Sequence, residues 1–199
     1  MSQLTPRVDF VFKILFGSKG SNAILKSLIN SVLMFEHPIT HITLLNPYNN
    51  KTHSTGKLSI LDIKAEDERG QLYNIEMQIT DQVDYSQRAL YYWSKLYSNQ
   101  LNAGESYGNL RKTISIHILN FNCFDEEDYH NVFHLLNAKT HHRAFEDLEL
   151  HFIELKKFKK DLKHMTTTLD RWTTFLSKAE QWESHIPLEL KETPEINEA

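Results

Sequence analysis

The stretch LSILDIKAEDERGQLYNIEMQIT, residues 58–80, contains two runs in which polar and apolar side chains alternate. Alternation with a period of two is typical of β-strands, so Leu58–Glu66 and Leu72–Thr80 are predicted strands. Gly70 lies in the short polar segment between them, where it favours a tight turn. The stretch therefore predicts an antiparallel β-hairpin.

The two faces of this hairpin determine its register. With Glu68-Arg69-Gly70 as the loop, Asp67 pairs with Gln71. Counting outward then places Asp62 opposite Glu76. A slip by one residue would bring the charges of one strand beside the apolar face of the other. Two opposed carboxylates repel each other in an ordinary sheet, and a divalent cation between them would offset the repulsion.

The polar face of the hairpin carries a candidate catalytic site. Asp62 and Glu76 are the candidate ligands for Mg²⁺ (or Mn²⁺), because such hard cations are held by one or two carboxylates and leave positions for phosphate oxygens. Gln78 would orient a water or a phosphate oxygen, and Lys64 would stabilise the charge that develops in phosphodiester cleavage. The alternative interpretation is a solvated sheet face, with Lys64 and Arg69 as partial counter-charges.

The composition is that of one globular domain. The chain has 199 residues, 40% of them hydrophobic and 24% charged, which suffices for one sizeable core but is short for two. The net charge of −4 argues against passive coating of DNA, because phosphate neutralisation normally needs a basic excess. An enzyme that contacts DNA through a local patch and a metal ion is still compatible with this charge.

The cysteine content and the N-terminus bear on the compartment. Cys123 is the only cysteine, which excludes an internal disulfide and fits a reducing environment. The sequence shows no signal peptide, and no apolar segment approaches the roughly 20 residues that span a bilayer. We therefore expect a cytoplasmic protein with no membrane segment.

The remaining segments predict further helices and strands. Thr5-Pro6 is expected to open a helix that runs through Phe16, and Ser21 or Asn22 to cap a second helix that Pro38 closes. Further predicted elements, by residue number, are strands at 39–45, 113–124, 131–138 and 148–155 and helices at 84–102 and 169–182.

The sequence also predicts a helix cap and a C-terminal tail at the borders of these elements. Asp84, with Gln87 three residues later, has the pattern of a capping box at the start of the long helix. Residues 183–199 are acidic and contain two prolines. We expect them to form a flexible tail after a domain that spans residues 1–182.

Several motifs together resemble the PD-(D/E)XK nuclease family transposases, the group that includes the recombination-promoting nucleases of bacteria. The first motifs are DFVFK at 9–13, ILDIKA at 60–65, Gly70 and NIEMQ at 74–78. Others follow in the same order: Arg88 with Tyr91-Tyr92, KLY at 95–97, Gly104, Tyr107, the strand from Ile114, and LDRWTTFL at 169–176. The resemblance extends over about residues 5–180.

The resemblance implies a restriction-endonuclease-like α/β core, with a central mixed sheet flanked by helices and a C-terminal helix. It implies DNA as the substrate and magnesium bound by Asp62 and Glu76. The third residue of the family motif is usually lysine, and here it is Gln78. An amide carries no positive charge, so catalysis would require Lys64 to take over that role. Asp9 would add an acid from the first helix, or would simply be favoured there by the helix macrodipole.

Basic side chains outside the hairpin are candidate DNA contacts. Arg88, Tyr91 and Lys95 lie at i, i+3 and i+7 of the predicted long helix and form one face that would contact phosphate. The run KKFKK at 156–160 is a second positive patch. For both features the alternative is a solvated surface.

Three functional hypotheses follow. The first is a magnesium-dependent DNA endonuclease. The second is a catalytically inactive module that keeps the nuclease fold for binding DNA or protein, which the glutamine at position 78 and the acidic net charge favour. The third adds a homodimer formed through the C-terminal helix around Trp172 and Phe175.

Overall fold

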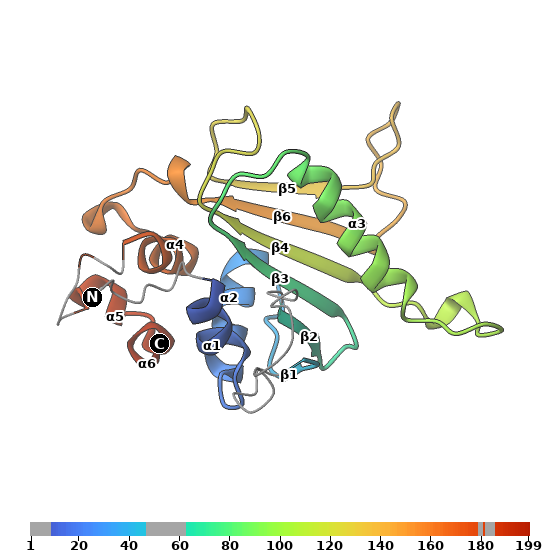
Figure 1. Ribbon diagram of the computed structural model, residues 1–199, viewed down its shortest axis with the longest axis horizontal. Helices are drawn as coiled ribbons and strands as arrows, with labels where there is room; N and C mark the ends of the chain where they lie inside the picture. The colour runs from blue at the N-terminus through green and yellow to red at the C-terminus, as the bar shows by residue number, and fades with distance from the viewer. Residues whose placement is uncertain (1–8, 47–62, 179–180, 182–185) are drawn as a thin grey trace.

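The computed structural model describes residues 9–46, 63–178, 181 and 186–199. Within these residues the centre is one mixed sheet with strand order β1–β2–β3–β4–β6–β5 (Figure 1). The strands are β1 (Ile42–Leu44), β2 (Ile63–Asp67), β3 (Leu72–Gln78), β4 (Thr113–Leu119), β5 (His130–His134) and β6 (Leu148–Glu154). The strands β3, β4 and β6 run parallel, and the other pairs are antiparallel. This arrangement confirms the predicted mixed sheet.

The β2–β3 hairpin has the register that the alternation predicts. Ile63 pairs with Ile75, and the amide of Asp67 donates to the carbonyl of Gln71 at 3.1 Å. Gly70 adopts the left-handed region with φ of 76°, where a side chain would be strained. Asp62 itself lies outside the described residues.

Asp67 explains why the turn closes where it does. Its Oδ1 accepts hydrogen bonds from the amides of Arg69 and Gln71, both at 2.9 Å. Its Oδ2 accepts from the hydroxyl of Tyr73 at 2.9 Å. An aspartate that binds its own backbone two residues ahead is a common turn-forming element, so the local sequence is sufficient for this geometry.

One face of the sheet packs against α1 (Asp9–Gly17), α2 (Asn22–Leu33) and α4 (Thr168–Lys178). Trp172 of α4 is fully buried, lies 5.5 Å from the ring of Phe16 between centroids, and donates from Nε1 to the hydroxyl of Ser27 at 3.2 Å. Phe175 is buried in the same core. Trp172 and Phe175 are therefore not available as a dimer surface, because both side chains are used within one chain. The homodimer itself stays a prediction.

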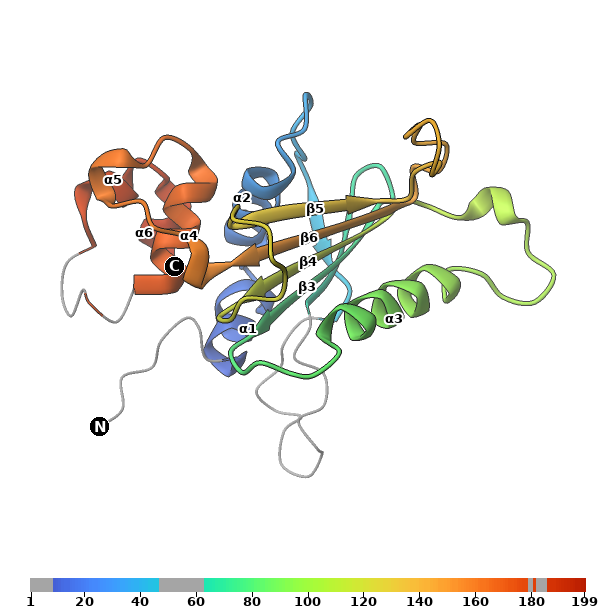
Figure 2. The same ribbon diagram turned by 90° about the horizontal axis from the view of Figure 1, so that it is seen from above.

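The opposite face is covered by α3 (Tyr85–Ser98), which connects the parallel strands β3 and β4 (Figure 2). Tyr85 and Ala89 of α3 pack on Leu119 and Phe152. The helix begins one residue after Asp84, which has φ of 64° and makes no capping hydrogen bond through its side chain. The predicted capping box is therefore absent, since the left-handed backbone turns the residue away from the usual N-cap geometry.

The C-terminal residues form α5 (Leu188–Lys191) and α6 (Pro194–Glu198), where a flexible tail was expected. Leu190 and Ile196 are fully buried in the main core, and Arg171 of α4 donates to the carbonyl of Glu189 at 3.1 Å. Figure 1 shows both short helices beside α4. Their buried apolar side chains pack against the domain. The acidic composition of the segment did not predict this packing.

Three short 3₁₀ helices complete the described elements: η2 (Tyr107–Asn109), η3 (Leu155–Lys157) and η4 (Leu162–His164). Strand β4 ends at Leu119, five residues earlier than predicted, and the amide of Asn120 donates to the carbonyl of Gln78 at 2.9 Å as the chain leaves the sheet. None of the described helices is long and apolar enough to cross a membrane.

Candidate active site

Glu76 lies near the carboxyl end of β3, on the face that α3 covers. Its side chain is 7% exposed, and its neighbours Asn74 and Gln78 on the same face are also buried. A charged carboxylate in such a place is costly unless it is paired. The alternative of a solvated sheet face is therefore wrong for Glu76.

Arg88 pairs with Glu76. Its Nη2 lies 3.0 Å from Oε1 of the carboxylate, and its Nη1 donates to Oε1 of Gln82. The guanidinium carbon lies 5.5 Å from the ring centre of Tyr92, one turn along α3. Three contacts therefore hold the guanidinium beside the acid. The sequence predicts Arg88 on a helix face that contacts phosphate. In the structure its guanidinium contacts Glu76, so Arg88 also belongs to the candidate site.

His117 is a further residue of the candidate site, and the sequence motifs did not predict it. It occupies the position of β4 that pairs with Glu76, and its Nδ1 lies 3.9 Å from Oε2 of that carboxylate. The hydroxyl of Tyr85 is within 3.0 Å of the same nitrogen. Burial, with Arg88 as a smaller cause, lowers the pKa of His117 to about 3, so its imidazole is neutral near pH 7.

A signal for His117 was present in the sequence. In the strand TISIHIL, residues 113–119, Thr113, Ser115 and His117 alternate with isoleucines. This pattern indicates a polar row on one face of an otherwise apolar strand. Only the parallel pairing with β3 shows that the row lies beside Glu76.

Gln78 and Lys64 lie on the same sheet face as Glu76. Gln78 is buried, and its amide nitrogen donates to the carbonyl of Thr80 at 3.3 Å. Lys64 pairs with Asn74 in the hairpin, and Asn74 is two residues from Glu76 on one face of β3. The backbone amide of Lys64 is held by Oδ1 of Asn46 at 2.7 Å.

Two predicted site residues are beyond what the structure describes. Asp62 lies outside the described residues, and Asp9 begins α1 with a side chain that is not described. Among the described side chains there is no group of three or more His, Cys, Asp or Glu that could hold a metal ion. Glu76 is described and its predicted partner Asp62 is not, so the two-carboxylate metal site stays a prediction.

Buried polar atoms around Glu76 are incompletely bonded. Within the described part of the chain, the atoms without a hydrogen-bond partner include Oδ1 of Asn74, Oγ of Ser115, Nε2 of His117 and Nε of Arg88. Buried polar groups are normally bonded to protein or ordered water. The polar atoms around Glu76 can therefore bond to water or ligand atoms.

The outer face of α3 is accessible. Tyr91 is 60% exposed, and Lys95 is exposed one turn further along. Both residues remain available for the predicted contact with phosphate, while the guanidinium of Arg88 is turned to Glu76.

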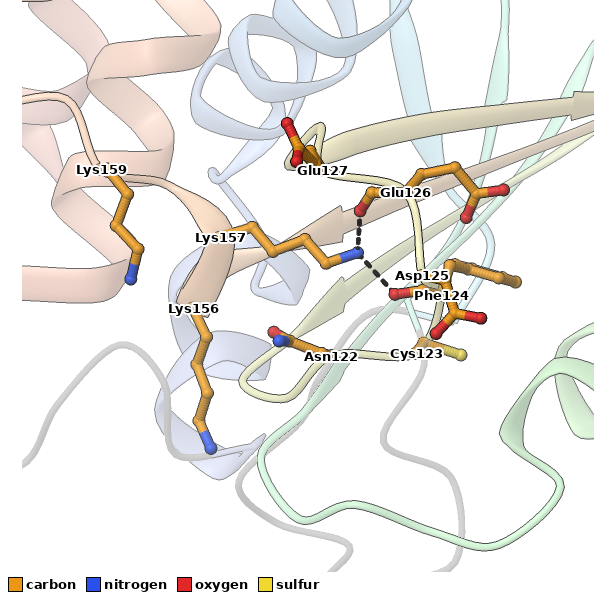
Figure 3. A pocket seen from close by; sticks show the side chains of 9 residues that line it. All are labelled: Asn122, Cys123, Phe124, Asp125, Glu126, Glu127, Lys156, Lys157 and Lys159. Atoms are coloured by element: carbon orange, nitrogen blue, oxygen red, sulfur yellow. Dashed lines mark hydrogen bonds between the residues drawn. The ribbon is translucent and has the colours of Figure 1, made fainter.

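The basic run at 156–160 is divided between internal and surface roles (Figure 3). Lys157 donates to the carbonyls of Phe124 and Glu126, at 2.8 and 2.6 Å, and to Glu154 at 2.8 Å. Lys156 and Lys159 are exposed and line a cavity of about 580 Å³ outside the carboxyl ends of β4 and β6. Three acidic residues, 125–127, line the same cavity, so its charge is mixed.

The strand order, the parallel pair joined by α3 and the acid on the second strand of the hairpin define a PD-(D/E)XK nuclease-like α/β protein. The sequence model of the PD-(D/E)XK nuclease family transposases matches residues 6–199, and the chain belongs to this family. Nucleases of this type act on DNA and generally use divalent metal ions. No curated protein and no solved structure matches the chain.

Proposed function

We propose that this protein is a DNA endonuclease that hydrolyses phosphodiesters with Mg²⁺ (or Mn²⁺) bound by Asp62 and Glu76. The observation that carries the proposal is the hairpin register. Ile63 pairs with Ile75, and the next residues outward along the chain are Asp62 and Glu76. Glu76 is buried, and it follows the Ile63–Ile75 pair on β3. This is the position expected for one of the two carboxylates that would bind the cation.

The donor set fits a hard cation. Carboxylate oxygens are the ligands that Mg²⁺ prefers, and one or two of them suffice when water and phosphate complete the coordination. The bound ion would activate water and neutralise charge on the phosphate. Glu76 is already held in place by Arg88, and Gln78 on the same face would orient a water or a phosphate oxygen.

Other residues would contribute to substrate binding. Lys64 shares the face of Glu76 and would add positive charge near the phosphate. Lys95 on the exposed face of α3 would contact the DNA backbone, and Asp9 would supply a further acid from α1. Electrostatic contacts of this kind supply most of the sequence-independent affinity for DNA.

Calorimetric titration with MgCl₂ tests the metal site directly. We expect binding by the unmodified protein and its loss in both Asp62→Ala and Glu76→Ala. Glu36→Ala is the matched control, because it removes an exposed carboxylate from the segment after α2. Cleavage of supercoiled and linear DNA with Mg²⁺ or Mn²⁺ should be lost in the same two variants and retained in the control.

A catalytically inactive module that binds DNA or protein is the second candidate. Gln78 favours it, because the neutral amide stands where lysine is usual and is bonded to Thr80. If the unmodified protein binds a DNA duplex but cleaves none with either metal, the enzyme proposal is wrong and the module is supported. Cleavage that depends on Asp62 and Glu76 excludes the module.

A further inference from the structure

We propose that Arg88 supplies the positive charge that Gln78 lacks, and that it contacts the scissile phosphate while it holds Glu76. This inference rests on the proposed endonuclease function. It differs from a general phosphate contact on a helix surface, because it places the guanidinium at the reacting group.

The chemistry requires such a charge. In hydrolysis an O–P bond forms from water, and the P–O bond to the leaving sugar oxygen breaks. The attacking water loses a proton to solvent, and the leaving oxygen gains one. Negative charge builds up on the non-bridging phosphate oxygens during this exchange, and a fixed cation beside them lowers the barrier. Arg88 stays protonated throughout and takes no part in the proton transfer.

The geometry places a cation next to the candidate metal ligand. Nη2 of Arg88 lies 3.0 Å from Oε1 of Glu76, whereas the side-chain amide of Gln78 donates to its own strand at Thr80. The side chain of Arg88 is 38% exposed and that of Glu76 is 7% exposed. The Arg88 side chain therefore extends from the buried acid to the protein surface, where a phosphate can reach it.

Arg88 also has unused donors. A guanidinium carries five N–H groups, and the hydrogen bonds to Glu76 and Gln82 use two of them. Nε of Arg88 is buried and has no partner among the described residues. Arginine binds carboxylate and phosphate through a planar fork, so one guanidinium can bind Glu76 and a phosphate oxygen together.

Lys64 is the competing source of charge. It lies on the same face, but its pairing position is opposite Asn74, two residues before Glu76 on β3. Arg88 contacts Glu76 directly, with Nη2 3.0 Å from Oε1, and on this contact we assign the role to the arginine.

Single-turnover cleavage of DNA at saturating protein and Mg²⁺ tests the assignment. We expect Arg88→Met to slow cleavage by about 100-fold or more, the usual effect of removing one preorganised donor. Arg88→Lys should retain an intermediate rate, because it keeps the charge and loses the fork. Gln78→Lys in the Arg88→Met background should restore at least about tenfold, because it returns a cation to the site. Arg111→Met, an exposed arginine before β4, should change the rate less than about twofold.

The outcomes separate this inference from the function on which it rests. If the unmodified protein cleaves DNA and Arg88→Met cleaves equally fast, the inference fails and the nuclease stands. If Arg88→Met is slow and folded, as thermal melting would show, but neither lysine variant exceeds it, Arg88 only positions Glu76 and the inference is wrong. If the unmodified protein cleaves no DNA with either metal, both fail.

Discussion

His117 and Glu76 occupy paired positions on the parallel strands β4 and β3, with Nδ1 of the imidazole 3.9 Å from Oε2 of the carboxylate. The ring of His117 also stacks on Phe152, with centroids 4.8 Å apart. A histidine next to an acid would ordinarily be favoured in its charged form. Complete burial outweighs this effect, so the site contains a neutral imidazole and an arginine–glutamate pair.

The first prediction concerns stability against pH. The pKa of His117 is lowered from its ordinary value of 6.5 to about 3, so below pH 6.5 the unfolded chain takes up a proton that the folded chain does not. The free energy of unfolding should therefore fall as the pH drops from about 6.5 toward 3. His117→Gln should reduce this slope by close to one proton, as measured by urea unfolding from pH 4 to 7. An unchanged slope would contradict the assigned burial, and His37→Gln at an exposed position is the control.

The second prediction concerns Asp170 at the start of α4. This fully buried carboxylate accepts hydrogen bonds from Lys160 and from the hydroxyl of Tyr129, both at 2.9 Å, and from the amide of Thr166 at 2.9 Å. Asp170→Ala should lower the free energy of unfolding by about 3 kcal/mol, because it leaves buried donors unbonded. Lys160→Met should lower the free energy of unfolding by about 1 kcal/mol, since that lysine is 40% exposed and Tyr129 and Thr166 still donate to the carboxylate. Equal losses in the two variants would contradict this account.

The lowered pKa of Asp170 also predicts that the free energy of unfolding falls in acid. Backbone and side-chain hydrogen bonds outweigh burial and lower its pKa from 3.8 to about 2. The carboxylate therefore contributes stability above its ordinary pKa, and the contribution is lost as the pH falls through about 2. In Asp170→Asn this part of the acid transition should be absent.

The third prediction separates two lysines of the basic run. Lys157 donates to two carbonyls of the segment after β4 and to the fully buried Glu154, whereas Lys159 is exposed at the cavity. Lys157→Met should destabilise the protein by about 2–4 kcal/mol, because it leaves a buried carboxylate without its cation. Lys159→Met should change stability by less than about 0.5 kcal/mol. Urea denaturation of both variants checks this, and similar stabilities would refute it.

The fourth prediction concerns the C-terminal helices. Leu190 is fully buried and Leu188 is 79% exposed, two residues apart in α5. Leu190→Ala should lower the free energy of unfolding by about 2–5 kcal/mol, because it removes buried apolar surface and leaves a cavity. Leu188→Ala should lower it by about 0.5 kcal/mol or less. If Leu190→Ala is as stable as Leu188→Ala, the segment is a flexible tail after all.

The local sequence was sufficient for the hairpin and its register. Alternation determines which side chains share a face, and Asp67 and Gly70 determine where the chain turns. Both effects act over a few residues, so they can be read from the sequence. The family motifs in turn predicted the mixed sheet, which the strand order confirms.

Only the tertiary structure decided what surrounds the face that carries Glu76. Alternation shows that Asn74, Glu76 and Gln78 lie together, but a solvated face and a face covered by a helix have the same pattern. The closure of α3 over β3 and β4 buries Glu76 and brings Arg88 to it from 12 positions further along the chain. The parallel pairing of β4 with β3 brings His117 to it from 41 positions further along. The same holds for α5 and α6, because two buried apolar residues in an acidic segment reveal their packing only when the core they complete is present.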